Sequence, residues 1–190
     1  MSPVPGFICL AGASGAGKDT LGAMLAEAHG YQRVALADPL KVAMMGLFGL
    51  GPEQLWGEAR NVPDARLGRA PRELYQRFGQ ACVELDPEVW LRPFRARVAS
   101  LRREGLRVVC TDLRTPREFE AAREMGAALW LITRPGAGAP GALGQHATER
   151  GVAAFEASRF DRALSNTGTL EQLREELSRA MEAPRAVAQP

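Results

Sequence analysis

The sequence predicts an α/β domain with a mainly parallel sheet, because short apolar runs alternate along the chain with segments of helical periodicity. A glycine-rich turn between the first apolar run and the first helical segment agrees with this class. The chain has 190 residues and 46% hydrophobic content, which suffices for one core and is too little for two full domains and a linker. Ligands of such a domain are expected at the carboxyl ends of the strands.

The expected strands are apolar runs of four to six residues, too short for helices and bounded by glycine, proline or polar residues. They occupy residues 7–11, 34–37, 107–111, 128–133 and 162–165.

The expected helices carry apolar residues at spacings of three and four. They occupy residues 19–29, 38–48, 87–104, 116–125, about 148–158 and 170–181. Pro39 suits a first helical position, and Gly49 ends the same helix. Residues 52–86 are rich in Arg, Glu and Gln without strand-like alternation, so they predict a helical insertion. Residues 135–141 are Gly, Ala and Pro, typical of a mobile loop or lid, and the tail after Ala183 is expected to fray.

Composition narrows the class of protein. Lys plus Arg total 24 against 22 for Asp plus Glu, which gives no general reason to expect a nucleic-acid or membrane partner. The first apolar run is far shorter than the roughly 20 residues of a membrane span and follows no basic leader, so we expect a cytoplasmic protein, in the host cytosol if viral. Cys9, Cys82 and Cys110 are widely spaced and are expected to be reduced core thiols. The sequence leaves open whether the protein forms a homodimer.

The strongest motif is a phosphate-binding loop of the pattern G-x-x-x-x-G-K. It comprises Gly12, Ala13, Ser14, Gly15, Ala16, Gly17 and Lys18. The motif stands between the first strand and the first helix, where backbone N–H groups and the helix N-terminus bind phosphate and the lysine reaches the outer phosphates. The chain has only two lysines, and one of them is here. A dinucleotide-binding turn is excluded because its glycines follow the spacing G-x-G-x-x-G.

The metal ligand of the motif is ambiguous. Asp19 stands where such loops usually place the Ser or Thr that binds Mg²⁺, and Thr20 follows it. Either side chain suits the metal. Alternatively, Asp19 is an acidic residue that stabilises the first turn of a helix.

Asp112 and Arg114 follow the buried strand 107–111 and are therefore expected at the carboxyl edge of the sheet, beside the loop. Asp112 would hold Mg²⁺ through water or accept a proton, and Arg114 would pair with a phosphate. The alternative is that Asp112 caps the helix that begins at Pro116.

The insertion carries candidate acceptor-binding groups at helical spacing, namely Arg69, Arg72, Gln76 and Arg77. Arg72 and Gln76 lie one turn apart on one face, which suits a monophosphate and a base, although a solvated helix face is the default for surface arginines. Trp56 and Trp90 either stack on a base or pack in the core.

Charged residues also flank the expected lid. Arg134 stands at its start and Arg150 at its end, with His146 and Glu149 between them. Arginines brought in by lid closure would neutralise charge on the phosphoryl group in transfer.

Several segments together resemble the bacteriophage-type deoxynucleoside monophosphate kinases, within the nucleoside monophosphate kinase group of P-loop proteins. These segments are residues 12–20 ending in GKDT, 37–41 (ADPLK), 71–79 with Trp90, 112–118 (DLRTPRE), 134–135 (RP), 146–149 (HATE) and 166–170 (NTGTL).

The resemblance implies a P-loop NTPase three-layer sandwich in three parts. A core of about 1–50, 87–133 and 160–183 carries the loop, a helical monophosphate-binding insert covers about 51–86, and a lid covers about 134–158. ATP and Mg²⁺ would serve phosphoryl transfer to a deoxynucleoside monophosphate. The implied acceptor-binding residues are Asp38, Lys41, Arg72, Gln76, Trp90, His146 and Glu149, the implied catalytic residues are Lys18, Asp112, Arg114, Arg134 and Arg150, and the implied metal ligands are Asp19, Thr20 and Asp112.

Two other functions fit the same motifs. One is a P-loop kinase of another small acceptor, such as dephospho-coenzyme A. The other is a non-catalytic regulatory module that binds ATP and contacts a partner protein.

Overall fold

The computed structural model describes residues 4–138 and 157–182. The described residues form two compact units, one of residues 4–35, 97–138 and 157–182 and one of residues 36–96. Below, the first is called the sheet unit and the second the helical unit. The boundary at residue 96 falls inside the helix α5, Leu91–Arg103.

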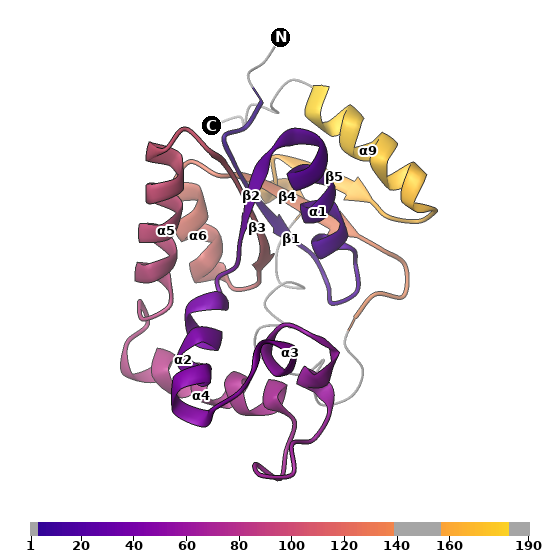
Figure 1. The fold of residues 1–190 in the computed structure, drawn as a ribbon. Coiled ribbons are helices and arrows are strands. Elements are labelled where there is room, and N and C mark those ends of the chain that lie inside the picture. Colours follow the sequence, from indigo (N-terminus) through magenta and orange to yellow (C-terminus); the bar gives the residue numbers. More distant parts are fainter. Residues whose placement is uncertain (1–3, 139–156, 183–190) are drawn as a thin grey trace. The chain divides into compact units, whose positions relative to one another are not determined.

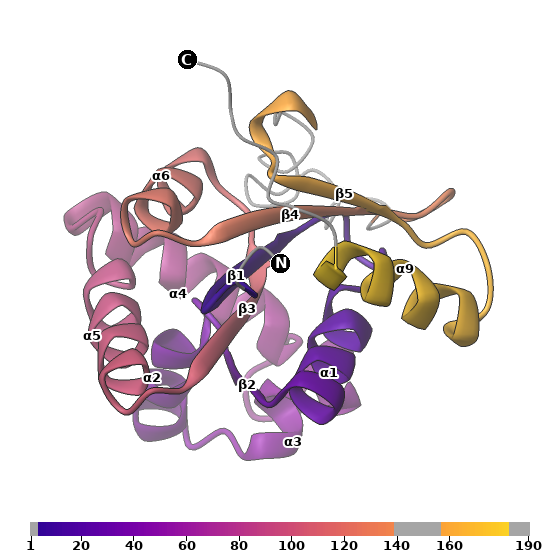
Figure 2. The same ribbon diagram turned by 90° about the horizontal axis from the view of Figure 1, so that it is seen from above.

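The sheet unit is built on a five-stranded parallel sheet in the order β2-β3-β1-β4-β5 (Figure 1). The strands are β1 (Phe7–Ala11), β2 (Tyr31–Val34), β3 (Arg107–Leu113), β4 (Ala128–Thr133) and β5 (Arg162–Ser165). Helices α1 (Lys18–His29) and α9 (Leu170–Glu182) lie on one face of the sheet, and α6 (Pro116–Glu124) lies on the other (Figure 2). This arrangement confirms the predicted α/β class with a parallel sheet. No helix among the described residues has the length and apolar content to cross a membrane.

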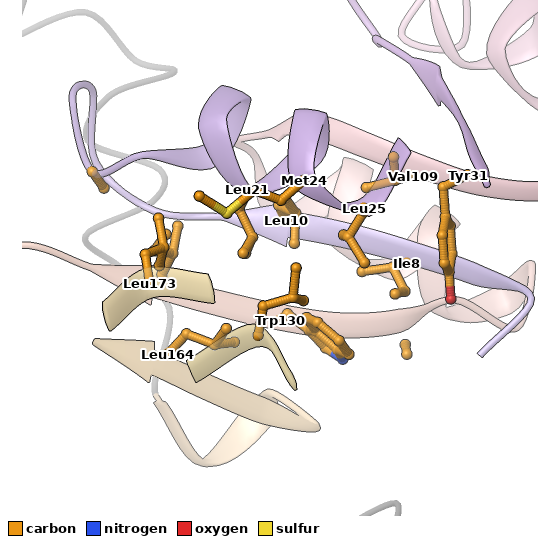
Figure 3. Packing of buried hydrophobic residues seen from close by; sticks show 14 residues of the cluster. Ile8, Leu10, Leu21, Met24, Leu25, Tyr31, Val109, Trp130, Leu164 and Leu173 are labelled. Carbon is orange, nitrogen blue, oxygen red and sulfur yellow. The ribbon is translucent and has the colours of Figure 1, made fainter. Parts of the chain in front are cut away.

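The core of the sheet unit lies between the sheet and the helices α1 and α9. Figure 3 shows Leu21 and Leu25 of α1 and Leu173 of α9 against strand residues such as Leu10 and Trp130. Every residue of β1 is buried. A strand covered on both faces reads as a continuous apolar run, and this is why its limits were predictable.

The predicted second strand was wrong by three residues. Residues 34–37 were expected, whereas β2 is Tyr31–Val34. Gly30 ends α1 in the left-handed conformation at φ 67°, and the chain enters the sheet at once. The Tyr31 side chain is buried, its hydroxyl donates to the Pro5 carbonyl, and burial raises the pKa of Tyr31 to about 12.

Other differences from the sequence predictions are smaller. The helix expected from residue 87 begins at Leu91, because the Asp86 carboxylate accepts a hydrogen bond from the Glu88 N–H and closes a turn first. Cys82 is partly exposed and is not a core thiol, whereas Cys9 and Cys110 are buried as expected, and all three are free. Most of the helix expected at about 148–158 lies outside the described residues. The next described segment begins with a 3-10 turn, η2 (Ala157–Arg159).

The helical unit contains α2 (Asp38–Phe48), α3 (Pro52–Leu55), the 3-10 helix η1 (Glu58–Asn61), α4 (Pro71–Leu85) and the first part of α5. Its own buried cluster consists of Leu40, Met44, Leu50 and Leu55, and Phe48, Tyr75, Phe78 and Trp90 pack against that cluster. A Cβ at Gly79 would lie 2.7 Å from Leu40 Cδ2, so this glycine lets α4 approach α2 closely. The insertion is also not purely helical, because Asp64 and Arg69 form an antiparallel bridge.

Candidate active site

The phosphate-binding loop occupies residues 12–17, between the end of β1 and the start of α1. A Cβ at Gly12 would lie 2.3 Å from the Ile132 carbonyl oxygen, and one at Gly17 would lie 2.5 Å from Asn166 Nδ2. Gly12, Gly15 and Gly17 have φ angles of 153°, 77° and 105°, values that side chains with a Cβ rarely adopt. The loop therefore needs glycine for its backbone conformation and, at two of these positions, for close packing as well.

Lys18 lies over its own loop. Its ammonium donates to the carbonyl oxygens of Gly12 and Ala13 at 2.7 and 2.8 Å, and the residue is only 8% exposed. A buried ammonium needs such partners. The hydrogen bonds hold one positive charge at the turn where the helix N-terminus also favours anions.

Asn166 fastens the loop from the other side. Its Nδ2 donates to the Ala16 carbonyl at 2.8 Å, its backbone N–H donates to the Thr133 carbonyl at 2.8 Å, and the residue is buried. Asn166 follows β5 and the loop follows β1, so the conformation of the loop depends on residues that are far apart in the sequence. Asn166 belongs to the segment 166–170 that resembles the kinase family, but the sequence alone indicates no role for its side chain.

Asp19 is held at the start of α1 by two side chains. Its Oδ1 accepts a hydrogen bond from the Thr111 hydroxyl at 3.0 Å and from Arg33 Nη2 at 3.1 Å. Thr111 is buried, whereas the Asp19 side chain is 84% exposed. A Cβ at Gly22 would lie 2.4 Å from Thr111 Cγ2, so α1 packs directly on β3 at this point. Sequence reasoning missed Thr111, Arg33 and Gly22.

Asp112 is part of β3, which runs two residues further than predicted. Its Oδ1 accepts a hydrogen bond from Cys110 Sγ at 3.3 Å. The alternative that Asp112 caps the next helix is wrong, because the N-cap of α6 is Thr115, whose Oγ1 accepts from the Glu118 N–H at 3.3 Å. Asp112 therefore stands near the strand's carboxyl end without capping α6.

Glu118 completes the cap and fixes the backbone beside Arg114. Its Oε2 accepts from the N–H groups of Arg114 and Thr115 at 2.7 and 2.9 Å. The pKa of Glu118 is raised to about 7, chiefly by burial and also by the nearby Asp112 carboxylate, although the two N–H groups act to lower it.

Oxygen-bearing side chains stand at the start of α1 and at the end of β3 in the sheet unit. Thr111 donates to Asp19, Asp112 is the next residue of the strand, and Thr20 is exposed in the first turn of α1. Within the described ranges, no group of three or more His, Cys, Asp or Glu forms a metal cluster. Carboxylates and hydroxyls are oxygen donors of the kind that Mg²⁺ uses when its substrate's phosphates supply the other ligands.

The candidate acceptor residues Asp38, Lys41, Arg72, Gln76 and Trp90 all lie in the helical unit. Lys41 of α2 lies 5.9 Å from the ring centroid of Tyr75, which is three residues from Arg72 on α4. The fold therefore brings the segment ADPLK to the arginine-bearing helix. Glu73 pairs with the neighbouring Arg69 at 3.6 Å and Arg77 at 3.7 Å.

Trp90 has a structural role in this unit. Its Nε1 donates to the Gly79 carbonyl at 3.2 Å and its ring packs against the buried cluster. These contacts agree with the alternative that Trp90 packs in the core. Trp56 is 39% exposed, and its Nε1 donates to Asp38 Oδ1 at 2.9 Å.

Of the residues that were expected in the lid, the structure describes Arg134. It is exposed at the end of β4, and its carbonyl accepts from the Ala137 N–H at 3.1 Å in a turn. His146, Glu149 and Arg150 lie outside the described residues.

Comparison with known proteins identifies the family. The sequence model of the deoxynucleotide monophosphate kinase family matches residues 69–177. A protein of Acanthamoeba polyphaga mimivirus, itself provisionally named a deoxynucleotide monophosphate kinase, is 32% identical over 144 residues, which are 68% of this chain and 75% of that protein. The phosphate-binding loop lies outside the region that the family model matches, so it is independent support.

Solved structures agree on the fold. An unliganded sugar kinase from Janibacter sp. HTCC2649 superposes with a TM-score of 0.52 at 16% identity, over 94% of both chains. A dephospho-CoA kinase from Campylobacter jejuni superposes with a TM-score of 0.51 at 11% identity, over 93% of this chain and 96% of that one. At such low identity these likenesses show a P-loop kinase fold and nothing about the acceptor. The family match, the mimivirus relative and the loop at the head of the central strand together establish that the chain belongs to the deoxynucleotide monophosphate kinase family and is a phosphotransferase.

Proposed function

We propose that the protein transfers the γ-phosphoryl group of magnesium-bound ATP to a deoxynucleoside monophosphate, with the donor at residues 12–20 and the acceptor at the helical unit. The observation that carries this proposal is the buried Lys18 ammonium, held on the carbonyls of a loop that close packing restricts to glycine. The turn holds a buried positive charge next to a helix N-terminus, an arrangement that suits a bound anion.

The loop and Lys18 bind the donor. Backbone N–H groups surround the phosphates, and the ammonium supplies a compact positive charge for the outer ones. The carbonyl partners of Lys18 fix this charge before the nucleotide arrives, so little reorganisation is needed on binding. Asn166 keeps the loop in the same conformation from the side of β5.

Magnesium would be held by Asp19, Thr20 and Asp112, directly or through water. Hard oxygen ligands of this kind suit Mg²⁺, which neutralises charge on the β- and γ-phosphates. Thr111 orients Asp19 for this role, whereas Arg33 contacts the same carboxylate oxygen, and Glu118 fixes the backbone that follows Asp112.

The acceptor needs no general base near neutral pH. A phosphate monoester loses its second proton at a pKa of about 6, so its oxygen is already an anion at pH 7. Of the two roles considered for Asp112, metal binding therefore fits the reaction better than proton abstraction. The main demand on the protein is to bring two anions together, which calls for positive charge from Arg114 and, at the lid, from Arg134 and Arg150.

An acceptor panel tests the proposal. The four deoxynucleoside monophosphates, their ribonucleotide counterparts and dephospho-coenzyme A are each supplied with ATP and Mg²⁺, and ADP formation is measured. We expect turnover with at least one deoxynucleotide and none with dephospho-coenzyme A. ATP binding without turnover of any acceptor would instead support the regulatory module, and turnover of dephospho-coenzyme A alone would favour the other kinase.

Two variants of Lys18 make the panel specific. Lys18→Ala should lose a factor of about a thousand or more in rate, since the charge that orients the phosphates is gone. Lys18→Arg keeps the charge but places a bulky planar fork in a closed loop, and should also fail. Full activity of either variant would refute the assigned donor site. Thermal unfolding serves as the control that both variants are folded.

A further inference from the structure

Lys41 lies between two aromatic rings of the helical unit. Its Nζ is 5.5 Å from the ring centroid of Trp56 and 5.9 Å from that of Tyr75. Both distances fall within the roughly 6 Å over which a cation is attracted to an aromatic face. The lysine comes from α2, Trp56 follows α3 and Tyr75 comes from α4, so three helices meet at one ammonium group.

Trp56 is itself fixed in place. Its indole N–H donates to Asp38 Oδ1 at 2.9 Å, and its carbonyl accepts from Arg60 Nη1 at 2.9 Å. Asp38 and Lys41 stand three residues apart on α2, on neighbouring positions of the helix surface. One helix therefore holds both the tryptophan's hydrogen-bond acceptor and the cation that its ring faces. The ring is nevertheless 39% exposed, so core packing alone does not account for this large side chain.

The composition of the chain makes a lysine at this position informative. The sequence has two lysines and 22 arginines, and the other lysine is Lys18 of the phosphate-binding loop. Arginine stacks on aromatic rings at least as well as lysine does, so stabilising the two rings would not require lysine. A compact ammonium differs from a guanidinium as a point charge with three freely directed donors, which is how lysine binds a phosphate group.

Neighbouring residues also suit a phosphate. Tyr75 lies on α4 three residues after Arg72 and one before Gln76, the pair predicted to bind the acceptor. The ring that contacts Lys41 therefore belongs to the helix that carries the arginine.

From these contacts we propose that Trp56 and Tyr75 form an aromatic clamp that positions the Lys41 ammonium for the phosphate of the acceptor. Trp56 and Tyr75 are positioning residues, and Asp38 acts through Trp56. The clamp restricts a long flexible side chain before the acceptor binds, which reduces the entropy lost on binding. The inference rests on the proposed function in one respect, that the acceptor is a monophosphate.

Lysine labelled with ¹³C at Cε gives a direct readout, because the chain has two lysine side chains to observe. Lys41→Arg assigns the signals. Lys41 should show protons displaced by the ring currents of Trp56 and Tyr75, and Trp56→Ala should remove much of that displacement. Addition of each of the four deoxynucleoside monophosphates without ATP should then shift Lys41 more than Lys18, and addition of ATP with Mg²⁺ should shift Lys18.

Kinetics provide the second readout. Trp56→Ala should raise the KM for the acceptor about tenfold and leave the KM for ATP within about twofold, which corresponds to the loss of a partly desolvated cation–π contact. Trp56→Phe keeps a ring over the ammonium and loses the hydrogen bond to Asp38, so it should recover part of the loss. Phe78→Leu is the matched control, because Phe78 packs against the same cluster and forms an edge contact with Phe48. It should lower stability without changing the Lys41 signal or the acceptor KM.

The outcomes separate the clamp from the proposed function. Turnover of deoxynucleotides with an acceptor KM that Trp56→Ala leaves unchanged would overturn the clamp and leave the kinase intact. A Lys41 signal that responds to no monophosphate would overturn it as well, whatever the turnover. If Phe78→Leu raised the KM for the acceptor as much as Trp56→Ala does, the effect would be one of protein stability, and the inference would also be refuted. Failure of the proposed function would appear separately, as a Lys18 signal that ATP does not shift or as an absence of turnover with every deoxynucleotide.

Discussion

The Thr111 hydroxyl donates a hydrogen bond of 3.0 Å to the Asp19 carboxylate, and so joins the end of β3 to the first turn of α1. Its methyl group occupies the space that a side chain at Gly22 would fill. One buried threonine therefore both orients a candidate metal ligand and sets the distance between the helix and the sheet. Variants of this contact test the site without touching the phosphate-binding loop.

Thr111→Val keeps the shape of the side chain and removes the hydroxyl. Asp19 then loses the hydroxyl that orients it, and we expect the Mg²⁺ concentration at half-maximal activity to rise about fivefold, the equivalent of about one hydrogen bond. Thr111→Ser keeps the hydroxyl, so its Mg²⁺ dependence should stay close to that of the wild type while its stability falls slightly. The measurement is a Mg²⁺ titration at saturating ATP. Equal Mg²⁺ curves for the valine and serine variants would contradict the role of the hydroxyl.

Arg33→Ala distinguishes Asp19 from Thr20 as the metal ligand. Arg33 contacts Asp19 at 3.1 Å and competes with a cation for the same oxygen. If Asp19 binds Mg²⁺, as we propose, the arginine's removal should lower the half-saturating Mg²⁺ concentration about two- to fivefold, the range of an exposed ion pair. Thr20→Ala is the companion variant. A large loss of Mg²⁺ affinity with Thr20→Ala, combined with no change for Arg33→Ala, would assign the metal to Thr20.

Gly17→Ala and Gly15→Ala separate close packing from backbone strain. Both glycines have positive φ angles, but a Cβ at Gly15 meets open space and one at Gly17 meets Asn166. Gly15→Ala should cost about 1 kcal/mol of folding stability, and Gly17→Ala should cost more and also abolish ATP binding. In the double variant Gly17→Ala with Asn166→Ala the clash is gone. The stability lost by the double variant should therefore be smaller than the sum of the losses of the two single variants. Urea unfolding and ATP titration measure these effects. Strictly additive stability losses would refute the contact between residues 17 and 166.

Glu118→Gln tests the raised pKa of Glu118. The folded-state pKa of about 7 exceeds the unfolded value of 4.5, so folding favours the protonated form. The resulting stability is fully present below pH 4.5 and is lost as the pH rises through 7, a change of about 1–3 kcal/mol in the free energy of unfolding. Gln accepts the same N–H groups without a charge. The two proteins should therefore match near pH 4.5, and the variant should be more stable at pH 8.

Glu118→Ala is the control for that comparison, because it loses the cap of α6 as well as the charge. Relative to Glu118→Gln, it should be less stable at both pH values by about 1 kcal/mol of capping. A difference between wild type and Glu118→Gln that does not change from pH 4.5 to pH 8 would show that the carboxyl group is ionised in the ordinary way.

The fold was predictable where burial on both faces leaves an uninterrupted apolar run. The limits of β1 and β4 agree with the sequence prediction for this reason, and those of the edge strand β5 agree as well although only Leu164 is buried in it. The second strand was misplaced because two exposed polar residues, Gln32 and Arg33, separate buried Tyr31 from buried Val34. Its apolar continuation to residue 37 lies outside the sheet. An edge strand whose middle residues are polar and exposed gives a weaker signal than a central strand.

The candidate site was predictable where one segment contains all its parts, as in the phosphate-binding loop. Thr111 and Asn166 act on residues 92 and 150 positions away, and local spacing gives no sign of either contact. The cap at Thr115 could have been found, because Thr115-Pro-Arg-Glu118 is a capping box visible in the sequence. The division of the chain into core, insert and lid, and the roles of His146, Glu149 and Arg150, remain predictions.

The hydrogen bond from Asn166 to Ala16 has a consequence for biosynthesis. The phosphate-binding loop leaves the ribosome before the side chain that holds it in place, which comes 150 residues later. Both neighbours of β1 in the sheet, β3 and β4, are also made long after it. A nascent chain made only as far as β3 thus holds the complete sequence of the loop without Asn166, and the loop reaches its folded form only after that residue has been made.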